Sequence, residues 1–355
     1  MRTQHCHILV VGAGPAGASA ATVAASKGLD VILIDRRRQV GCPVRCAEYI
    51  PAALLGETQA GRHFVVQDIR RMRTFLPDGT TMETKAPGYT IHRDRFDQAL
   101  VGKAREAGAR LHLGTRALYL QEKKVFLKTA DGSFSTLEAE VILGADGPHS
   151  TVGSWMGSVN KHMVPAVQVR VPLRHPMEDT EVYFEKDIYG GYGWLFPKGE
   201  EANVGIGMKT VRGKRPTIRK VLNRFLDRLV KEGKIEREPR CMTAGWLPAE
   251  PLSKVVSGNI LLAGDAAGHT HSITGAGVAQ AVICGKKAGK WAARAVIAED
   301  LSLIEGYDKD WRGHFGEMLE RAYERRLELE RNWNHLDRVI RRCWVTFREY
   351  YGSKG

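Results

Sequence analysis

A glycine-rich turn near the start of the chain has the residue types and spacing that bind a dinucleotide. The motif Gly12-Ala13-Gly14-Pro15-Ala16-Gly17 follows an apolar run at residues 8–11 and precedes an alanine-rich stretch. Glycines at this spacing let the backbone approach a pyrophosphate at the N-terminus of a helix. A second apolar run, residues 31–34, ends in Asp35, which is placed to hold the hydroxyls of an adenosine ribose.

Two later glycine–aspartate turns decide which dinucleotide is bound. They are Gly144-Ala145-Asp146-Gly147 and Gly264-Asp265-Ala266-Ala267-Gly268. A nicotinamide dehydrogenase has little use for such turns, whereas a buried FAD is held at both ends by turns from distant segments. We expect Asp265 to accept from ribityl or pyrophosphate-side hydroxyls. A helix starting around Thr274-Gly275-Ala276-Gly277 would direct its N-terminal N–H groups at the flavin pyrimidine edge.

Because the three motifs must converge, the sequence predicts an α/β protein of two interleaved domains. A Rossmann-type FAD-binding domain is expected at residues 1–70, 93–157 and 256–300, an antiparallel-sheet substrate domain at 71–92 and 158–255, and a C-terminal helical segment at 301–355. The periodicity predicts helices at 94–107 and 216–231, a strand pair at 117–127 and 134–143 with a turn at 130–132, and strands at 164–171, 180–184, 193–196 and 203–207.

Composition indicates a globular enzyme. The 355 residues are 43% hydrophobic and 26% charged, which is ordinary globular usage. Lysine and arginine number 53 against 40 acidic residues, and the net charge of +13 implies attraction to polyanions or anionic lipid surfaces. No nucleic-acid-binding signature accompanies this charge, so nucleic acid is not an expected partner.

Cysteine spacing and hydropathy bear on metals and location. The 6 cysteines form no CxxC pair, which argues against a structural metal and against a disulfide framework. No run approaches the roughly 18–20 apolar residues of a membrane-spanning helix, and residues 1–7 are polar. We expect a cytoplasmic protein, with peripheral membrane contact left open.

Three further segments carry a family resemblance. Together with the three motifs, Arg93-Asp94-Arg95-Phe96-Asp97 resembles FAD proteins related to aromatic hydroxylases. The segment Gly41-Cys42-Pro43-Val44-Arg45-Cys46-Ala47-Glu48 is similar to the Pro-x-x-Cys-x-Glu segment of the geranylgeranyl reductase family. Tyr192-Gly193-Trp194-Leu195-Phe196-Pro197 resembles that family's lipid-pocket motif, with Tyr189 at the position of its first proline. The resemblance spans residues 5 to about 315.

The resemblance implies reduction of carbon–carbon double bonds in an isoprenoid or similar apolar substrate. A hydride would come from reduced flavin and a proton from the protein. The candidate proton donors are Cys46, Glu48 and Tyr49, where the family segment passes the flavin. Their structural alternatives are a small buried thiol for Cys46, an ion pair with Arg45 or a helix cap for Glu48, and a pocket wall for Tyr49.

The remaining site predictions concern the cofactor and the pocket. On a strand Tyr192, Trp194 and Phe196 share one face, where they would line a substrate channel or pack a core. Arg45 and Arg93 suit the pyrophosphate or ribityl chain, and residues 36–38 suit the adenosine end or form a solvated loop. The predicted cofactor-binding residues are Gly12, Gly14, Pro15, Ala16, Gly17, Asp35, Arg36, Arg45, Cys46, Ala47, Arg93, Asp146, Gly147, Gly264, Asp265, Gly275, Ala276 and Gly277.

The sequence departs from the family beside the late motif. Family members usually carry an apolar residue at His269, a proline at Ser272, and glutamate or glycine at Ala276. His269 and His271 would tune the flavin potential, donate a proton, link to the flavin, or simply donate to backbone carbonyls. We place His271 among the substrate-binding residues.

The chain end and the reaction class leave alternatives. Residues 324–348 form a basic amphipathic helix with tryptophans, which suits a membrane-surface anchor, a helix packed on the cofactor domain, or a dimer interface. The competing functions are a quinone-linked flavoprotein dehydrogenase, a flavin monooxygenase or halogenase, and a flavin-carrying binding protein. The reductant is NAD(P)H, a ferredoxin-like protein or another carrier, because no second dinucleotide motif exists.

Overall fold

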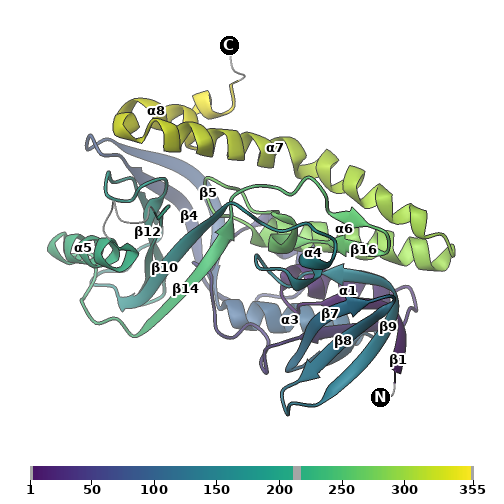
Figure 1. The fold of residues 1–355 in the computed structure, drawn as a ribbon. Coiled ribbons are helices and arrows are strands. Elements are labelled where there is room, and N and C mark those ends of the chain that lie inside the picture. Colours follow the sequence, from purple (N-terminus) through teal and green to yellow (C-terminus); the bar gives the residue numbers. More distant parts are fainter. Residues whose placement is uncertain (1–2, 211–216, 353–355) are drawn as a thin grey trace.

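The computed structural model describes residues 3–210 and 217–352, which form two sheets and their covering helices (Figure 1). The strands of the first sheet are β1 Thr3–Val11, β2 Val31–Asp35, β6 Arg110–Leu113, β7 Thr115–Gln121, β8 Lys124–Thr129, β9 Phe134–Gly144, β15 Val256–Ser257 and β16 Ile260–Leu262. The strands of the second are β3 Tyr49–Pro51, β4 Val65–Phe75, β5 Thr81–Ile91, β10 Met163–Pro172, β11 Thr180–Tyr183, β12 Tyr192–Lys198, β13 Glu201–Gly207 and β14 Cys241–Pro248. The helices are α1 Pro15–Ala25, α2 Ala53–Thr58, α3 Arg93–Glu106, α4 Thr151–Trp155, α5 Ile218–Lys231, α6 Val278–Ile297, α7 Gly306–Arg331 and α8 Leu336–Cys343.

The first sheet brings the three glycine motifs to one edge. Its order is β15-β16-β9-β1-β2-β6, and β1 is parallel to both β2 and β9. Val11 at the end of β1 pairs with Ile34 of β2 and Gly144 of β9, and Gly144 also pairs with Leu262 of β16. The motifs that follow these strands therefore meet at the carboxyl edge of a parallel sheet, where such folds bind their ligands. The predicted Rossmann-type fold is confirmed.

Two helices that begin at different motifs pack directly against each other. A Cβ atom on Gly285 of α6 would lie 2.2 Å from the carbonyl oxygen of Ala16 in α1. One on Gly289 would lie 2.3 Å from the carbonyl oxygen of Ala20. Only glycine permits this approach, and it fixes the N-terminus of α6 beside that of α1.

The second sheet contains the predicted antiparallel strands and several that the sequence did not reveal. Its order is β14-β10-β13-β12-β11-β4-β5-β3. The strands predicted at 164–171, 180–184, 193–196 and 203–207 correspond to β10 to β13. The helices predicted at 94–107 and 216–231 correspond to α3 and α5. Pro216 lies outside the described residues. The long pair β4 and β5 was missed, and the predicted domain boundary at 70/71 lies inside β4.

One predicted strand is wrong in its extent. Residues 117–127 do not form a single strand, because the chain reverses between β7 and β8, which pair antiparallel. Glu122, in that reversal, has a left-handed backbone with φ of 54°. The predicted turn at 130–132 does separate β8 from β9.

The C-terminal helices lie across both layers (Figure 1). Tyr307 and Trp311 of α7 belong to the core of the first domain, whereas Leu329 near its end packs with Val182 and Phe184 of the second sheet region. The apolar side chains expected to anchor the chain to a membrane are buried in this same cluster; they are Trp333, Leu336, Ile340, Trp344 and Phe347. The C-terminal segment is therefore buried against the protein, and it packs on the second sheet as well as on the cofactor domain.

Among the described residues, no helix is both long enough and apolar enough to cross a bilayer.

Candidate active site

The first motif forms an open turn at the start of α1. The N-cap residue is Gly14, and no atom lies within 4 Å of the position that a Cβ would take there. On the other side of the turn, a Cβ on Gly17 would lie 1.8 Å from the carbonyl oxygen of Gly12. The turn is closed where it meets the sheet and open where a pyrophosphate would approach the helix N-terminus.

Asp35 lies directly beside this turn. Its Oδ2 accepts from the backbone N–H of Ala13 at 2.9 Å, and its Oδ1 accepts from that of Arg37 at 2.8 Å. Each carboxylate oxygen retains a further acceptor position for a ribose hydroxyl. Burial lowers the pKa of Arg37, and the Asp35 carboxylate opposes that shift. Arg36, which the sequence singled out, is exposed, whereas Arg37 is half-buried next to Asp35.

Asp146 of the second motif is already engaged within its own loop. Its Oδ1 accepts from the Ser150 hydroxyl at 2.5 Å, and its Oδ2 accepts from the N–H of Thr151 at 2.6 Å. These bonds stabilise the first turn of α4. The geometry gives Asp146 a role in shaping the turn, and its place among the cofactor ligands stays a prediction.

Asp265 of the third motif has fewer protein partners. Its Oδ1 accepts from the Thr270 hydroxyl at 2.8 Å and lies 3.5 Å from the position of a Cβ on Gly277, the N-cap residue of α6. Burial raises the pKa of Asp265, while Thr270 and the Arg93 charge oppose the increase. A partly exposed carboxylate at a helix N-terminus fits the hydroxyls of a bound FAD.

Replacing Asp265 with alanine should lower FAD occupancy of the purified protein far more than replacing Asp146. The reason is that both carboxylate oxygens of Asp146 already accept hydrogen bonds from Ser150 and Thr151 at the start of α4, whereas Asp265 has a second oxygen available to the cofactor. Flavin absorbance per protein after gel filtration measures the occupancy. Full occupancy in Asp265→Ala would show that this carboxylate does not contact the cofactor.

The loops of the second and third motifs are joined by a residue that the sequence did not reveal. The amide nitrogen of Asn160 donates to the carbonyl oxygens of Pro148 at 2.9 Å and of Asp265 at 2.8 Å. A single asparagine in a loop carries no recognisable pattern, and only the fold shows its role.

Glu48 is the centre of a buried ionic cluster. The side chain is 1% exposed, and its Oε2 accepts from Lys198 at 2.7 Å, Asn203 at 2.9 Å and Arg170 at 3.2 Å. Its Oε1 accepts from the backbone N–H of Arg93 at 3.0 Å. Burial alone would raise the pKa of Glu48, but Lys198 and these hydrogen bonds hold it below its ordinary value.

These partners correct two sequence-based interpretations of Glu48. An ionised carboxylate with a lowered pKa has no proton to give at neutral pH, so Glu48 is not suited to be the proton donor. Its ion-pair partners are Lys198 and Arg170, not Arg45. The backbone of Glu48 has φ of 68°, a left-handed conformation that costs free energy in a non-glycine residue and is held here by the buried contacts.

Cys46 is held against the second sheet and close to Arg93. Its carbonyl oxygen accepts from the amide of Gln168 at 2.8 Å, and its Sγ accepts from the N–H of Glu48 at 3.3 Å. Burial alone would lower the pKa of Arg93, but the nearby Asp97 and Cys46 raise it, and the net change is an increase. The Nε of Arg93 donates to Oδ1 of Asp97 at 2.8 Å. Cys46 and Arg93 therefore lie close together, with a permanent cation beside the half-buried thiol.

The contacts of Tyr49 and Arg45 fit packing roles better than a role in proton transfer. The Tyr49 hydroxyl donates to the carbonyl of Ala86 at 3.0 Å, and burial raises its pKa to about 12. Its ring packs edge-on against Phe196 at 6.2 Å. The exposed Arg45 lies over β14, where a Cβ on Gly245 would be 3.7 Å from its own.

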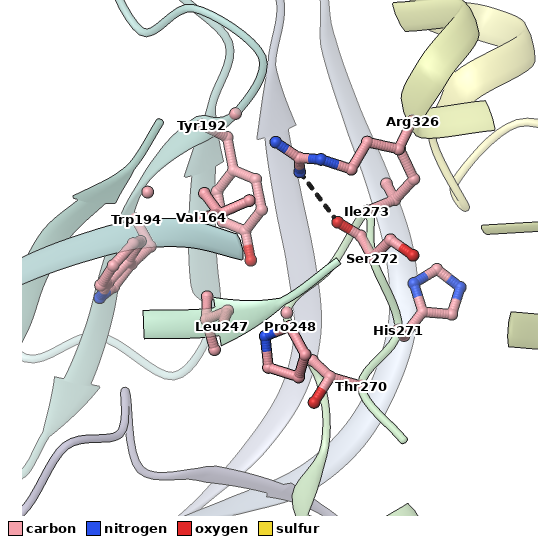
Figure 2. A pocket seen from close by; sticks show the side chains of 13 residues that line it. Val164, Tyr192, Trp194, Leu247, Pro248, Thr270, His271, Ser272, Ile273 and Arg326 are labelled. Atoms are coloured by element: carbon pink, nitrogen blue, oxygen red, sulfur yellow. Dashed lines mark hydrogen bonds between the residues drawn. The ribbon is translucent and has the colours of Figure 1, made fainter. Parts of the chain in front are cut away.

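A pocket opens between the aromatic face of β12 and the loop after the third motif (Figure 2). Tyr192, Trp194 and Leu247 form one wall, and the opposite wall is the loop that carries His271 and Ile273. Phe196 shares the strand face but packs against Tyr49, so two of the three predicted aromatics line the pocket. The lining of the pocket is mostly apolar.

Arg326 of α7 closes the pocket and was missed by sequence reasoning. It donates to the carbonyl oxygens of Ser272 at 3.1 Å and of Gly190 at 2.8 Å. The Tyr192 hydroxyl donates to the carbonyl of Thr274 in the same loop. Together these bonds fix the loop after the third motif against β12.

The two histidines are neutral in the folded protein. Burial lowers the pKa of His271 to about 4 and that of His269 to about 3. Nδ1 of His271 accepts from the N–H of Thr274 at 3.2 Å, so Nε2 carries the hydrogen and donates to the Tyr350 hydroxyl at 3.0 Å. The ring of His269 lies 4.5 Å from that of Trp311. His271 lines the pocket, and its partner is a tyrosine hydroxyl and not a backbone carbonyl; its contact with substrate stays a prediction.

Comparison with known proteins defines the family. A profile of the geranylgeranyl reductase catalytic domain matches residues 164–245, and a profile of FAD-dependent oxidoreductases matches residues 7–146. A digeranylgeranylglycerophospholipid reductase of Methanothrix thermoacetophila is 35% identical over 339 residues, which are 89% of this chain and 85% of the relative. The chain belongs to the geranylgeranyl reductase family. Another such reductase, from Methanosphaerula palustris, is 34% identical over 91% of this chain and 86% of its own.

Solved structures agree with membership of the geranylgeranyl reductase family. A geranylgeranyl bacteriochlorophyll reductase-like protein of Thermoplasma acidophilum superposes with a TM-score of 0.84 at 26% identity, covering 95% of this chain and 92% of that one. A flavin-dependent brominase has a TM-score of 0.75 at 16% identity, covering 95% of this chain and 93% of that one, and shares the fold alone. This member of the geranylgeranyl reductase family is an FAD-dependent oxidoreductase.

Proposed function

We propose that this protein reduces carbon–carbon double bonds of a polyprenyl lipid. The observation that carries the proposal is the pocket walled by Tyr192, Trp194 and Leu247 at the loop that follows Asp265. A pocket that is largely apolar and opens beside the FAD motifs fits an unactivated alkene better than a polar substrate. The names of relatives 34–35% identical to this chain support the same substrate class.

The side chains have distinct roles in this proposal. Reduced FAD, when bound, supplies the hydride. Tyr192 and Trp194 hold the hydrocarbon against the apolar wall of the pocket. Cys46 holds at its Sγ the proton that is delivered to the second carbon.

The reductant and the location complete the proposal. NAD(P)H or a ferredoxin-like protein delivers electrons to the flavin, since the sequence carries only one dinucleotide-binding motif. The net charge of +13 favours a cytoplasmic protein that contacts an anionic membrane surface, where a lipid substrate is available.

The decisive experiment is anaerobic photoreduction followed by addition of a polyprenyl phospholipid or a quinone. Reoxidation by the polyprenyl lipid, with a product heavier by two hydrogens per reduced bond, is the expected result. Reoxidation by the quinone alone would favour a quinone-linked dehydrogenase. An oxygenated product formed only in air would favour a monooxygenase.

Replacing Cys46 with alanine should slow alkene reduction by about 10²-fold, which is the usual contribution of a positioned acid. Cys46→Ser replaces the thiol with a hydroxyl donor of similar size and should retain more activity than Cys46→Ala. FAD occupancy should be equal in both variants, and single-turnover reoxidation of the reduced flavin measures the step. An unchanged rate in Cys46→Ala with FAD bound would move the proton donor to Tyr49 or a water.

A further inference from the structure

Two buried polar atoms on strands of the second sheet have no hydrogen-bonding partner among residues 3–210 and 217–352. They are Oε1 of Gln168 and Nε1 of Trp194. Each residue is only 8% exposed. Buried polar side-chain atoms are nearly always paired, with protein or with ordered water, so each of these two atoms requires a partner.

The two side chains lie in one row across the sheet. Gly205 of β13 pairs with Gln168 of β10 on one side and with Trp194 of β12 on the other. A Cβ on Gly205 would lie 2.3 Å from Cζ2 of Trp194 and 2.6 Å from Cβ of Gln168. The indole therefore lies over the glycine, toward Gln168. Its nitrogen points away from the rest of the pocket lining (Figure 2).

The orientation of the Gln168 amide follows from its neighbour. A backbone carbonyl only accepts, and the Cys46 carbonyl lies 2.8 Å from the amide group of Gln168. The nitrogen must be the end that faces Cys46, which leaves Oε1 as the free acceptor. The occupant must therefore donate to Gln168 and accept from the Trp194 N–H.

We propose that a single water molecule binds between Oε1 of Gln168 and Nε1 of Trp194. Water both donates and accepts, and it is small enough for a site on a closely packed sheet face. The resulting chain runs from the Trp194 indole through water to Gln168 and on to the Cys46 carbonyl. Gln168 and Trp194 are thus positioning residues that tie Cys46 to the pocket wall, whatever substrate the pocket takes.

Double-mutant analysis of Trp194→Phe and Gln168→Met tests the water site. Trp194→Phe keeps an aromatic ring and removes only the N–H donor, and Gln168→Met keeps the length of the side chain. Each should lower the thermal midpoint. The double variant should lower it by less than the sum, because both changes break the same bridge. The cycle is measured with and without FAD.

Alkylation of Cys46 provides a readout that a purely structural role would not move. Iodoacetamide labelling of Cys46, followed by peptide mapping, should be at least about threefold faster in either single variant than in the natural protein. The double variant should label no faster than the single variants. The exposed Cys241 serves as an internal reference. Trp246→Phe is the matched control, because it deletes the same N–H from a tryptophan that is 47% exposed.

Several results would overturn the water site. A higher thermal midpoint in Trp194→Phe would mean that the N–H had no partner, and additive effects would mean that the two atoms share no ligand. Coupling confined to the FAD-bound protein would assign the site to the flavin edge and not to water. If Gln168→Met does not fold, the alkylation rate of Cys46 in Trp194→Phe decides, and an unchanged rate rejects the proposal.

Discussion

Replacing Glu48 with glutamine should destabilise the folded protein by about 3–5 kcal/mol, the usual cost of leaving a buried charge without its partner. Lys198, whose side chain is 3% exposed, would keep its charge and lose the carboxylate 2.7 Å away. Chemical denaturation at neutral pH measures the change. Glu178→Gln is the matched control: Glu178 pairs with Arg70 on the surface, where an ion pair contributes about 0–1 kcal/mol.

The effect of Glu48→Gln should also depend on pH in a defined direction. The pKa of Glu48 is lower in the folded protein than in the unfolded chain, where it is about 4.3. Its stabilisation is therefore fully present above the unfolded pKa and is lost as the pH falls through the lower folded pKa. The difference between the natural protein and Glu48→Gln should be largest near neutrality and shrink in acid. A constant difference down to pH values of about 3 would contradict the ionic cluster.

The convergence of the three glycine motifs was predictable because their signals are local. Each motif is a strand, a glycine turn and a helix start within a few residues, and parallel strands place their carboxyl ends at one edge. The pairing of Val11 with Gly144, and of Gly144 with Leu262, is the outcome that this rule requires.

The neighbours of the catalytic candidates were not predictable in the same way. Glu48 and Lys198 are 150 positions apart, and no periodicity links them. Arg326 lies on α7 among many charged residues, and a polar residue on an amphipathic helix is normally expected to face water. The strand β4 was missed because Val65–Phe75 is rich in charge; its arginines form surface ion pairs with neighbouring strands and loops.

Replacing Trp344 with alanine should destabilise the protein by about 3–5 kcal/mol, the range for truncating a large buried aromatic. Trp344 is 1% exposed, and its Nε1 donates to the Thr74 hydroxyl at 3.0 Å. Its ring lies 5.0 Å from that of Phe184 and 5.4 Å from that of Tyr192. Its loss would leave a cavity behind a wall of the pocket, so binding of an apolar ligand should weaken together with stability.

Trp344→Ala also distinguishes two roles for the C-terminal segment, packing on the protein and anchoring in a membrane. The exposed Arg338 on α8 provides the comparison, and Arg338→Gln should leave the unfolding free energy within about 0.5 kcal/mol of the natural value. Denaturation and flotation with anionic vesicles are measured for both variants. A tryptophan inserted in lipid would behave in the opposite way: Trp344→Ala would then abolish vesicle binding and leave the stability of the free protein unchanged. Because Trp344 packs against Phe184 and Tyr192, we expect Trp344→Ala to lose stability in the free protein and Arg338→Gln to keep it.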